Sequence, residues 1–233
     1  MSTQNYMIGV DIGTTSTKAV LFKENGEVVA KAGGEYPLHT PTPSTAEQDP
    51  EQIFQTVLSS VQGVMADTGI SPKQVLFVSF SAAMHSVIAV DKEGVPLTRC
   101  ITWADNRSAA WSAKLKKELG GMELYLRTGT PIHPMSPVTK LMWLRHDQPS
   151  VFKQTAKLIS IKEYVYYKLF GKYVVDHSIA SSTGMMNLEA LAWDQEALKL
   201  AGITEDQLST LVPTTHIMTG LKEEYASRMG LLP

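Results

Sequence analysis

The sequence contains little cysteine, little net charge and no long apolar run. Its single cysteine, Cys100, has no partner for an internal disulfide, which is typical of proteins in a reducing compartment. With 21 basic and 23 acidic residues the formal net charge is -2, so the composition indicates no basic face for nucleic acid or anionic membranes. The longest uncharged stretch, 75–90, is shorter than the roughly 20 residues of a membrane span. We therefore expect small molecules as partners, with no nucleic acid and no membrane.

Several catalytic signatures are also missing. The sequence has no HExxH or paired-cysteine motif, which argues against a zinc site, and no Gly-x-Ser-x-Gly elbow of a serine hydrolase. Residues 1–6 are polar and lack the basic and then apolar layout of a signal peptide. We therefore expect a cytoplasmic protein.

The residues that are present predict a folded α/β domain. At 233 residues, with 43% hydrophobic residues and no linker-like segment, the chain is long enough for one large domain. Residues 7–12, 17–22 and 27–36 are rich in β-formers and separated by tight turns, which predicts an antiparallel meander. Apolar residues recur every three or four positions over 50–69, which predicts a helix that covers the sheet. The run at 75–80 predicts a strand buried on both faces.

From residue 107 onward the pattern becomes helical. Helices are predicted at 108–119, 137–146, 161–170, 193–201 and 222–229. The prolines of 129–137 and the small hydroxyl residues of 176–183 predict irregular segments. The order of elements therefore favours a mixed sheet flanked by helices.

The first candidate site is the turn in residues 11–18, Asp-Ile-Gly-Thr-Thr-Ser-Thr-Lys. A carboxylate at a strand end beside a glycine turn is well placed to hold Mg²⁺ or its water, and the N–H groups of 13–16 can surround phosphate oxygens. This is not a Walker A loop, because Gly-Lys-Ser/Thr is absent and a strand follows. The alternative interpretation is a plain turn that joins two strands.

His85 provides the second candidate, at the exit of the next predicted strand. The surrounding residues 79–86, Ser-Phe-Ser-Ala-Ala-Met-His-Ser, are mostly small and let a ligand approach the backbone. A histidine at this place can bond a hydroxyl or a carboxylate. The alternative is a histidine whose polar atoms are satisfied inside the core.

The third candidate is Thr-Trp-Ala-Asp-Asn-Arg at 102–107. Polyol binding needs this mixture, since Trp103 offers a flat apolar face, Asp105 an acceptor, and Arg107 a forked donor for an acid group. The alternative is a helix start with Asp105 or Asn106 as its cap and Trp103 in the core.

Residues 8–18 resemble the first phosphate motif of the FGGY carbohydrate kinases. Ala-Glu-Gln-Asp-Pro at 46–50, Ala-Met-His at 83–85 and Trp-Ala-Asp-Asn-Arg at 103–107 are similar to later segments of that family, in the same order. The resemblance extends over essentially the whole chain.

Within the family, the segments most similar to bacterial gluconate kinases are 100–108, 129–135 and 184–188. Xylulose kinases are expected to have Gly-Gln-Met-His-Gly where this chain has Ala-Ala-Met-His-Ser at 82–86. The resemblance therefore favours gluconate over xylulose as the substrate.

The resemblance implies a ribonuclease H-like fold of the actin and hexokinase type. Residues 1–233 would form a single N-terminal lobe with a helical insertion at about 107–200. ATP and Mg²⁺ are the implied cofactors, with Asp11 as the catalytic residue that coordinates the metal. The residues implied to face the ATP phosphates are Gly13, Thr14, Thr15, Ser16 and Lys18. Those implied to surround the sugar acid are Met84, His85, Trp103, Asp105 and Arg107, with Arg107 or His85 as the charge partner of its carboxylate.

The implied reaction moves the γ-phosphoryl group of ATP to the terminal hydroxyl of gluconate. Family members continue into a second lobe with the adenosine pocket and the general-base aspartate. We expect that lobe to be absent here and the base to lie beyond Pro233. We therefore expect this chain to be inactive alone. The alternatives are a kinase for another sugar, such as xylulose, and a non-catalytic sugar-acid-binding module. A homodimer is left open.

Overall fold

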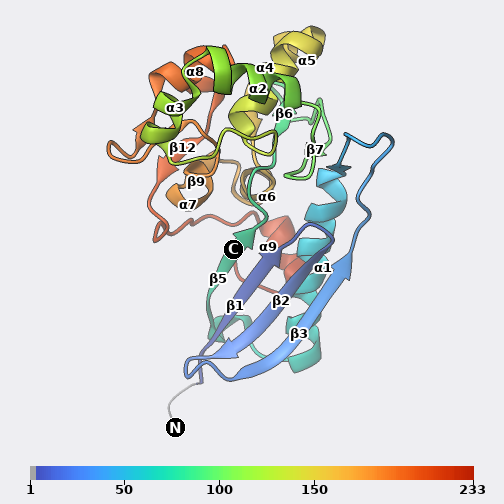
Figure 1. Cartoon of the computed structure of the whole chain (residues 1–233). Coiled ribbons are helices and arrows are strands. Elements are labelled where there is room, and N and C mark those ends of the chain that lie inside the picture. The colour runs from blue at the N-terminus through green and yellow to red at the C-terminus, as the bar shows by residue number, and fades with distance from the viewer. Residues whose placement is uncertain (1–3) are drawn as a thin grey trace.

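The computed structural model describes residues 4–233. Residues 1–3, which are part of the polar start that argued against a signal peptide, lie outside the described residues. Its main sheet has the order β3-β2-β1-β5 (Figure 1). The strands β1 (Tyr6–Ile12), β2 (Ser16–Lys23) and β3 (Val28–Glu35) form the predicted antiparallel meander. The fourth strand, β5 (Val75–Ala82), runs parallel to β1.

The helix α1 (Pro50–Thr68) covers one face of this sheet, as predicted. Asp49 begins it, because its side chain accepts hydrogen bonds from the N–H groups of Glu51 at 2.9 Å and Gln52 at 3.3 Å. Gly69 ends it in the left-handed conformation, at φ 62°. The apolar stripe of α1 then packs on the alternate, inward residues of the strands. The buried members of this core include Ile8, Val10, Leu21, Phe54, Val57 and Val61.

The prediction that the strand at 75–80 is buried on both faces is wrong. β5 lies at an edge of the sheet and pairs only with β1 among the described strands. The helix α1 covers one face, and on the opposite face Phe77 is 51% exposed. Leu76, which a register shift leaves without a partner on β1, is 53% exposed. Apolar composition alone did not reveal which face the rest of the described chain leaves uncovered.

A second core lies beyond the sheet, in the helical upper part of Figure 1. It is built by α2 (Ala109–Glu118), α3 (Gly121–Thr128), α4 (Pro137–Asp147), α5 (Pro149–Gln154), α7 (His177–Ala180) and α8 (Gln195–Ala201). Two other helices, α6 (Ile161–Phe170) and α9 (Glu223–Met229), add Tyr164 and Met229 to the sheet core instead.

The five helices predicted after residue 107 are present, with ends that differ by at most two residues. The sequence missed α3 and α5, because α3 begins in a Gly-Gly pair that indicates a break and α5 has only six residues. The segment 176–183, predicted to be a loop, contains the single turn of α7, which is capped by the side chain of Asp176.

In the described part of the chain, four short strand pairs lie outside the main sheet, and two of them, β4 with β7 and β6 with β8, contribute buried residues to both cores. The pairs are β4 (Glu47–Gln48) with β7 (Cys100–Ile101), β6 (Ile88–Val90) with β8 (Lys157–Ile159), β9 (Val174–Asp176) with β12 (Thr210–Val212), and β10 (Met186–Asn187) with β11 (Ala192–Trp193). Single 3₁₀ turns, η1 (Pro72–Gln74) and η2 (Glu205–Gln207), complete the elements. The pairing of β4 with β7 brings the proline-rich loop that follows β3 against the Trp-Asp-Arg segment.

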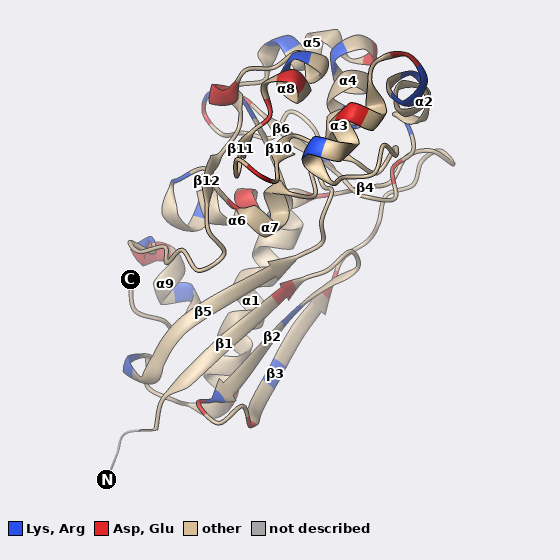
Figure 2. Ribbon diagram, turned by 60° about the vertical axis from the view of Figure 1, so that its left-hand side comes forward, with Lys and Arg blue, Asp and Glu red and all other residues tan. Residues whose placement is uncertain are grey.

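Basic and acidic residues are scattered over both the sheet and the helices, with the two signs side by side (Figure 2). Within residues 4–233, no helix has the length and apolar character to cross a membrane.

Candidate functional site

The turn between β1 and β2 has its carbonyl oxygens tied to the protein. Tyr36 Oη donates to the carbonyl oxygen of Gly13 at 2.7 Å, and the Tyr36 N–H donates to that of Thr15 at 3.1 Å. The Gln48 side-chain amide donates to the carbonyl oxygen of Thr14. Three successive carbonyl oxygens therefore accept hydrogen bonds from other parts of the protein, and these bonds hold the turn in place.

The amide N–H groups of the same turn are used differently. The Gly13 N–H closes the hairpin on the Ser16 carbonyl oxygen at 2.9 Å. The N–H groups of Thr14 and Thr15 make no hydrogen bond to any residue in the described range 4–233, and Thr15 is exposed. Successive amides that are free while their carbonyls are bound elsewhere form an anion-binding concavity. The donor set therefore fits the phosphate groups of a nucleotide.

Asp11 lies beside this turn on the open face of the sheet. Its neighbours in register are Lys18 on β2 and Ser81 on β5, and Asp11 and Lys18 are both exposed. Directly opposed residues of an antiparallel pair have Cβ atoms about 5 Å apart, so the carboxylate and the ammonium border the same patch. The described residues contain no group of three or more His, Cys, Asp or Glu side chains that could hold a metal ion. A single carboxylate is nevertheless a fitting ligand for Mg²⁺ held mainly by phosphates.

Trp103 joins the turn to the third predicted segment. Its indole Nε1 donates to Thr14 Oγ1 at 2.9 Å, although its side chain remains 49% exposed. The alternative in which Trp103 belongs to the core is therefore wrong. The ring is held at the edge of the turn between β1 and β2, with much of its surface free for a ligand.

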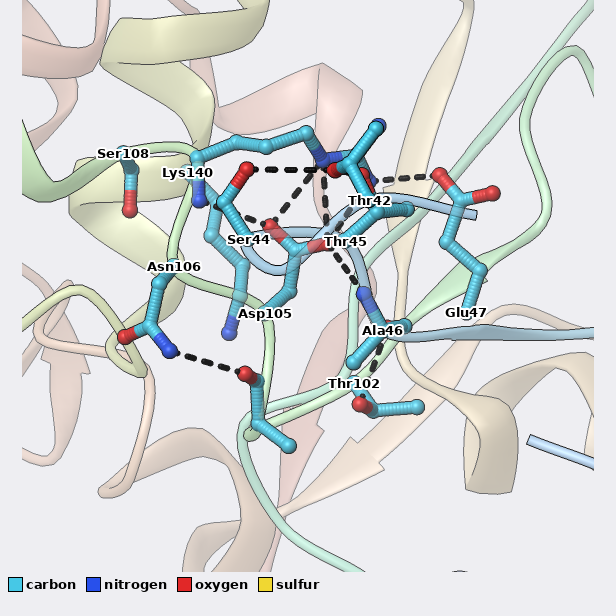
Figure 3. A network of polar contacts seen from close by, with 12 residues as sticks. Thr42, Ser44, Thr45, Ala46, Glu47, Thr102, Asp105, Asn106, Ser108 and Lys140 are labelled. Atoms are coloured by element: carbon cyan, nitrogen blue, oxygen red, sulfur yellow. Dashed lines mark hydrogen bonds and ion pairs between the residues drawn. The ribbon is translucent and has the colours of Figure 1, made fainter. Parts of the chain in front are cut away.

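Asp105 and Arg107 form an ion pair that also includes Glu47. Figure 3 shows the two carboxylates of this group, Asp105 and Glu47. Arg107 Nε lies 3.1 and 2.9 Å from the two Asp105 oxygens, and Arg107 Nη2 lies 2.5 Å from Glu47 Oε1. Asp105 is only 1% exposed, and its Oδ2 also accepts the Ala46 N–H at 2.9 Å. Although burial acts to lower it, the carboxylates of Asp105 and Glu47 raise the pKa of Arg107, so the guanidinium stays charged. The guanidinium also lies 4.5 Å from the ring centre of Trp143.

The proline-rich loop is fixed to this segment by further hydrogen bonds, also visible in Figure 3. Thr102 Oγ1 donates to the Ala46 carbonyl oxygen at 2.9 Å, and the Asn106 N–H donates to that of Ser44 at 2.8 Å. Glu47 then contacts Arg107 while its neighbour Gln48 contacts Thr14. Adjacent residues of β4 therefore link the segment 102–107 to the turn between β1 and β2.

His85 lies after β5 with an unusual backbone conformation, φ 65°. Its Nδ1 is 2.8 Å from the Ser182 carbonyl oxygen. Burial lowers the pKa of His85, although the hydrogen bond to Ser182 acts to raise it, so the surroundings favour the neutral ring. Its neighbour Met84 is 40% exposed.

The sequence reasoning missed Lys140, which connects His85 to the rest of the site. Lys140 Nζ donates to the His85 carbonyl oxygen at 2.9 Å and to that of Met135, and Figure 3 places the lysine beside Asp105. It also missed Glu47 and Gln48, which were quoted as part of a family segment without a role. The available signal for Lys140 was a single charge inside a mostly apolar helical stretch, 137–144, since a lysine is rarely buried without partners.

A turn with free amides and a carboxylate lie on the open face of a mixed sheet, next to an exposed tryptophan and an ion-paired arginine. This is the arrangement expected of one lobe of a sugar kinase. The chain belongs to the FGGY family of carbohydrate kinases, whose N-terminal domain matches residues 6–233.

Relatives and solved structures support this assignment. The chain is 55% identical over 229 residues to gluconokinase of Bacillus subtilis strain 168, covering 98% of this chain and 44% of that protein. A gluconate kinase from Lactobacillus acidophilus superposes with a TM-score of 0.94 at 37% identity, covering 98% of this chain and 46% of that one. A ligand-bound xylulose kinase from the same organism gives 0.94 and 37%, with coverages of 97% and 46%. The chain thus spans about half the length of the proteins it matches, and the predicted actin and hexokinase type of fold is confirmed.

Proposed function

We propose that this chain forms the phosphate-holding and sugar-binding half of an ATP-dependent kinase that phosphorylates a sugar acid, with D-gluconate as the substrate and 6-phosphogluconate as the product. The contact between Trp103 and Thr14 carries the proposal, because it places a surface suited to a sugar directly beside a turn suited to phosphate. The 55% identity to a gluconokinase supports gluconate over other sugars.

On the nucleotide side, the free amides of Thr14 and Thr15, with the hydroxyls of the turn, would hold ATP phosphate oxygens. Lys18 would lie across the patch from Asp11 and offset negative charge. Asp11 would hold the magnesium ion, directly or through water, and the bound ion supplies charge neutralisation during transfer. These are interactions of alignment and electrostatics, which phosphoryl transfer chiefly requires.

On the sugar side, the exposed face of Trp103 would pack against the C–H surface of the substrate. Arg107 keeps its charge while bound to two carboxylates, so its remaining donors are held in a fixed direction. We propose that Arg107 orients the sugar acid, and that Asp105, being 1% exposed, acts through Arg107 rather than by contact. Met84 and His85 would complete this side.

In the reaction, a bond forms between the terminal hydroxyl oxygen of gluconate and the γ-phosphorus, and the bond from that phosphorus to its bridging oxygen breaks. The hydroxyl proton must pass to a base. We propose that this base lies in the part of the related kinases that the chain does not cover.

We also propose that the protein is cytoplasmic.

The test compares two proteins: the 233-residue chain, and a full-length form in which it is continued over the remaining length of its relatives. We expect the full-length form to transfer phosphate from ATP to gluconate with a higher kcat/KM than to xylulose, and the 233-residue chain to show no turnover. Preference for xylulose would overturn the assignment of gluconate, and turnover by the shorter chain would overturn the missing base. Absence of transfer to either sugar would overturn the kinase proposal.

A further inference from the structure

Lys140 is a buried amine to which the proposed reaction assigns no role. It lies in the first turn of α4 and is 1% exposed, among apolar neighbours such as Val138 and Leu141. Its Nζ donates to two backbone carbonyls, those of His85 and Met135, from segments that are far apart in the sequence. A lysine at such a position loses its hydration, and the two hydrogen bonds to carbonyl oxygens offset that cost.

The contact to His85 restrains a backbone conformation that is unfavourable for a side chain. A non-glycine residue in the left-handed region costs on the order of 1 kcal/mol or more, and it persists where the surroundings fix it. Two contacts do so here, since Lys140 holds the His85 carbonyl oxygen and the Ser182 carbonyl oxygen holds the ring at Nδ1.

The contact with Ser182 also determines the tautomer of the ring. A carbonyl oxygen can only accept, so in the neutral ring Nδ1 carries the hydrogen and Nε2 carries a lone pair. Nε2 has no partner among residues 4–233 and does not belong to the fully buried atoms left without a partner there, so it is not sealed from solvent. An open imidazole acceptor fits a hydroxyl donor better than a carboxylate.

The same turn of α4 holds the loop that carries Met135. Ser136 Oγ donates to the Pro131 carbonyl oxygen at 2.6 Å, and Thr139 Oγ1 donates to that of His133 at 3.0 Å. Lys140 therefore ties this loop to the segment that follows β5 and contains His85.

We infer that Lys140 is a positioning residue for the sugar half of the site: it fixes the backbone of His85 so that Nε2 accepts a hydrogen bond from a hydroxyl of the substrate. This inference rests on the proposed function and adds a role for His85 that differs from pairing with the substrate carboxylate.

Steady-state kinetics of the full-length form test the inference. We expect Lys140→Met to raise the KM for gluconate about tenfold or more, the effect of leaving a buried carbonyl acceptor without its donor, and to leave the KM for ATP within twofold. The matched control is Lys157→Met, because Lys157 Nζ also donates to a backbone carbonyl, that of Leu208 at 2.8 Å, but lies on β8. Equal increases in both KM values, or an equal effect in the control, would overturn the positioning role.

His85→Asn provides a second variant, since the amide can still donate toward Ser182 but lacks the outer acceptor. It should raise the KM for gluconate by a similar factor while the melting temperature stays close to that of the parent. An unchanged KM would refute the role of Nε2. Because His85→Asn leaves Lys140 in place, it tests the role of His85 Nε2 even where Lys140→Met fails to fold.

Heteronuclear NMR of the His85 ring separates this inference from the proposed function. In the 233-residue chain we expect Nδ1 to carry the proton and Nε2 to be unprotonated at neutral pH, and Lys140→Met to mix the two tautomers. If the full-length form does not phosphorylate gluconate, the proposed function fails, and this measurement still tests the link from Lys140 to His85. A single, unchanged tautomer in the variant would contradict that link.

Discussion

The indole Nε1 of Trp103 donates a hydrogen bond of 2.9 Å to Thr14 Oγ1, across 89 residues of sequence. This bond joins the turn between β1 and β2 to the segment that carries Arg107. A turn whose free amides were packed in the interior, far from Trp103, would have argued against nucleotide binding. The observed arrangement instead places the two halves of the proposed phosphoryl-transfer site next to each other.

Trp103→Phe keeps the aromatic face and removes the donor to Thr14. We expect kcat/KM for gluconate to fall about fivefold, which corresponds to roughly 1 kcal/mol for one hydrogen bond. The control is Trp111→Phe, because Trp111 Nε1 donates at 2.8 Å to Asp147 in the helical part, away from the turn. A loss of the same size in both variants would show that the bond to Thr14 has no special role.

Asp11→Asn in the full-length form should lower kcat at least a hundredfold, because the metal loses a negative ligand that acts on the phosphate charge. The KM for gluconate should stay within twofold, since Asp11 lies on the phosphate side of the site. Asp67→Asn, which changes an exposed acid of α1, controls for the loss of one charge. An unchanged kcat in Asp11→Asn would remove Asp11 from its proposed role.

Asp105→Ala should destabilise the 233-residue chain by about 3 kcal/mol, measured by urea unfolding. The substitution leaves the Ala46 N–H without its buried acceptor and the Arg107 guanidinium with Glu47 alone. Glu27→Ala, which breaks the exposed pair with Lys23, should leave the unfolding midpoint nearly unchanged. Equal midpoints for Asp105→Ala and the parent would contradict the structural role of this carboxylate.

Lys140 should make the stability of the chain increase with pH above neutrality. Burial lowers the pKa of Lys140 to about 7, although Asp105 and Cys100 act to raise it, whereas the ordinary value is 10.5. Between these values the unfolded chain holds a proton that the native chain has released, so raising the pH stabilises the native state, by at most about 1.4 kcal/mol per pH unit. A neutral amine still has two N–H donors, enough for both carbonyls.

Urea unfolding of the parent and of Lys140→Met between about pH 7 and pH 9 measures this contribution, because the variant lacks the group. We expect the stability of the parent to rise relative to that of the variant. A constant difference across this range would show that Lys140 keeps its proton in the folded chain.

Cys100 should resist alkylation until the chain unfolds. Burial raises the pKa of the Cys100 thiol to about 12, and the residue is 0% exposed. With iodoacetamide at pH 8 we expect no modification of the native chain and complete modification in denaturant, as measured by mass spectrometry. Rapid labelling under native conditions would mean that the pairing of β4 with β7 opens readily.

Local sequence signals predicted most of the regular elements. Asp49 and Gly69 begin and end α1 through interactions with immediate neighbours, and the turn at Gly13 closes a hairpin between adjacent strands. Such features depend on residues a few positions apart, so their spacing is visible in the chain itself. The edge position of β5 was not visible in this way, because it depends on which other elements cover each face of the sheet.

By itself, the sequence determined the candidate segments: the turn at 11–18, the end of β5 at His85, and the run from Trp103 to Arg107. Only the tertiary structure decided how they are joined. The Gln48 amide reaches Thr14 over 34 residues, Glu47 reaches Arg107 over 60, and Lys140 reaches His85 over 55. These partners are selected by three-dimensional proximity and by the need to satisfy buried polar groups, and neither condition leaves a fixed spacing in a sequence.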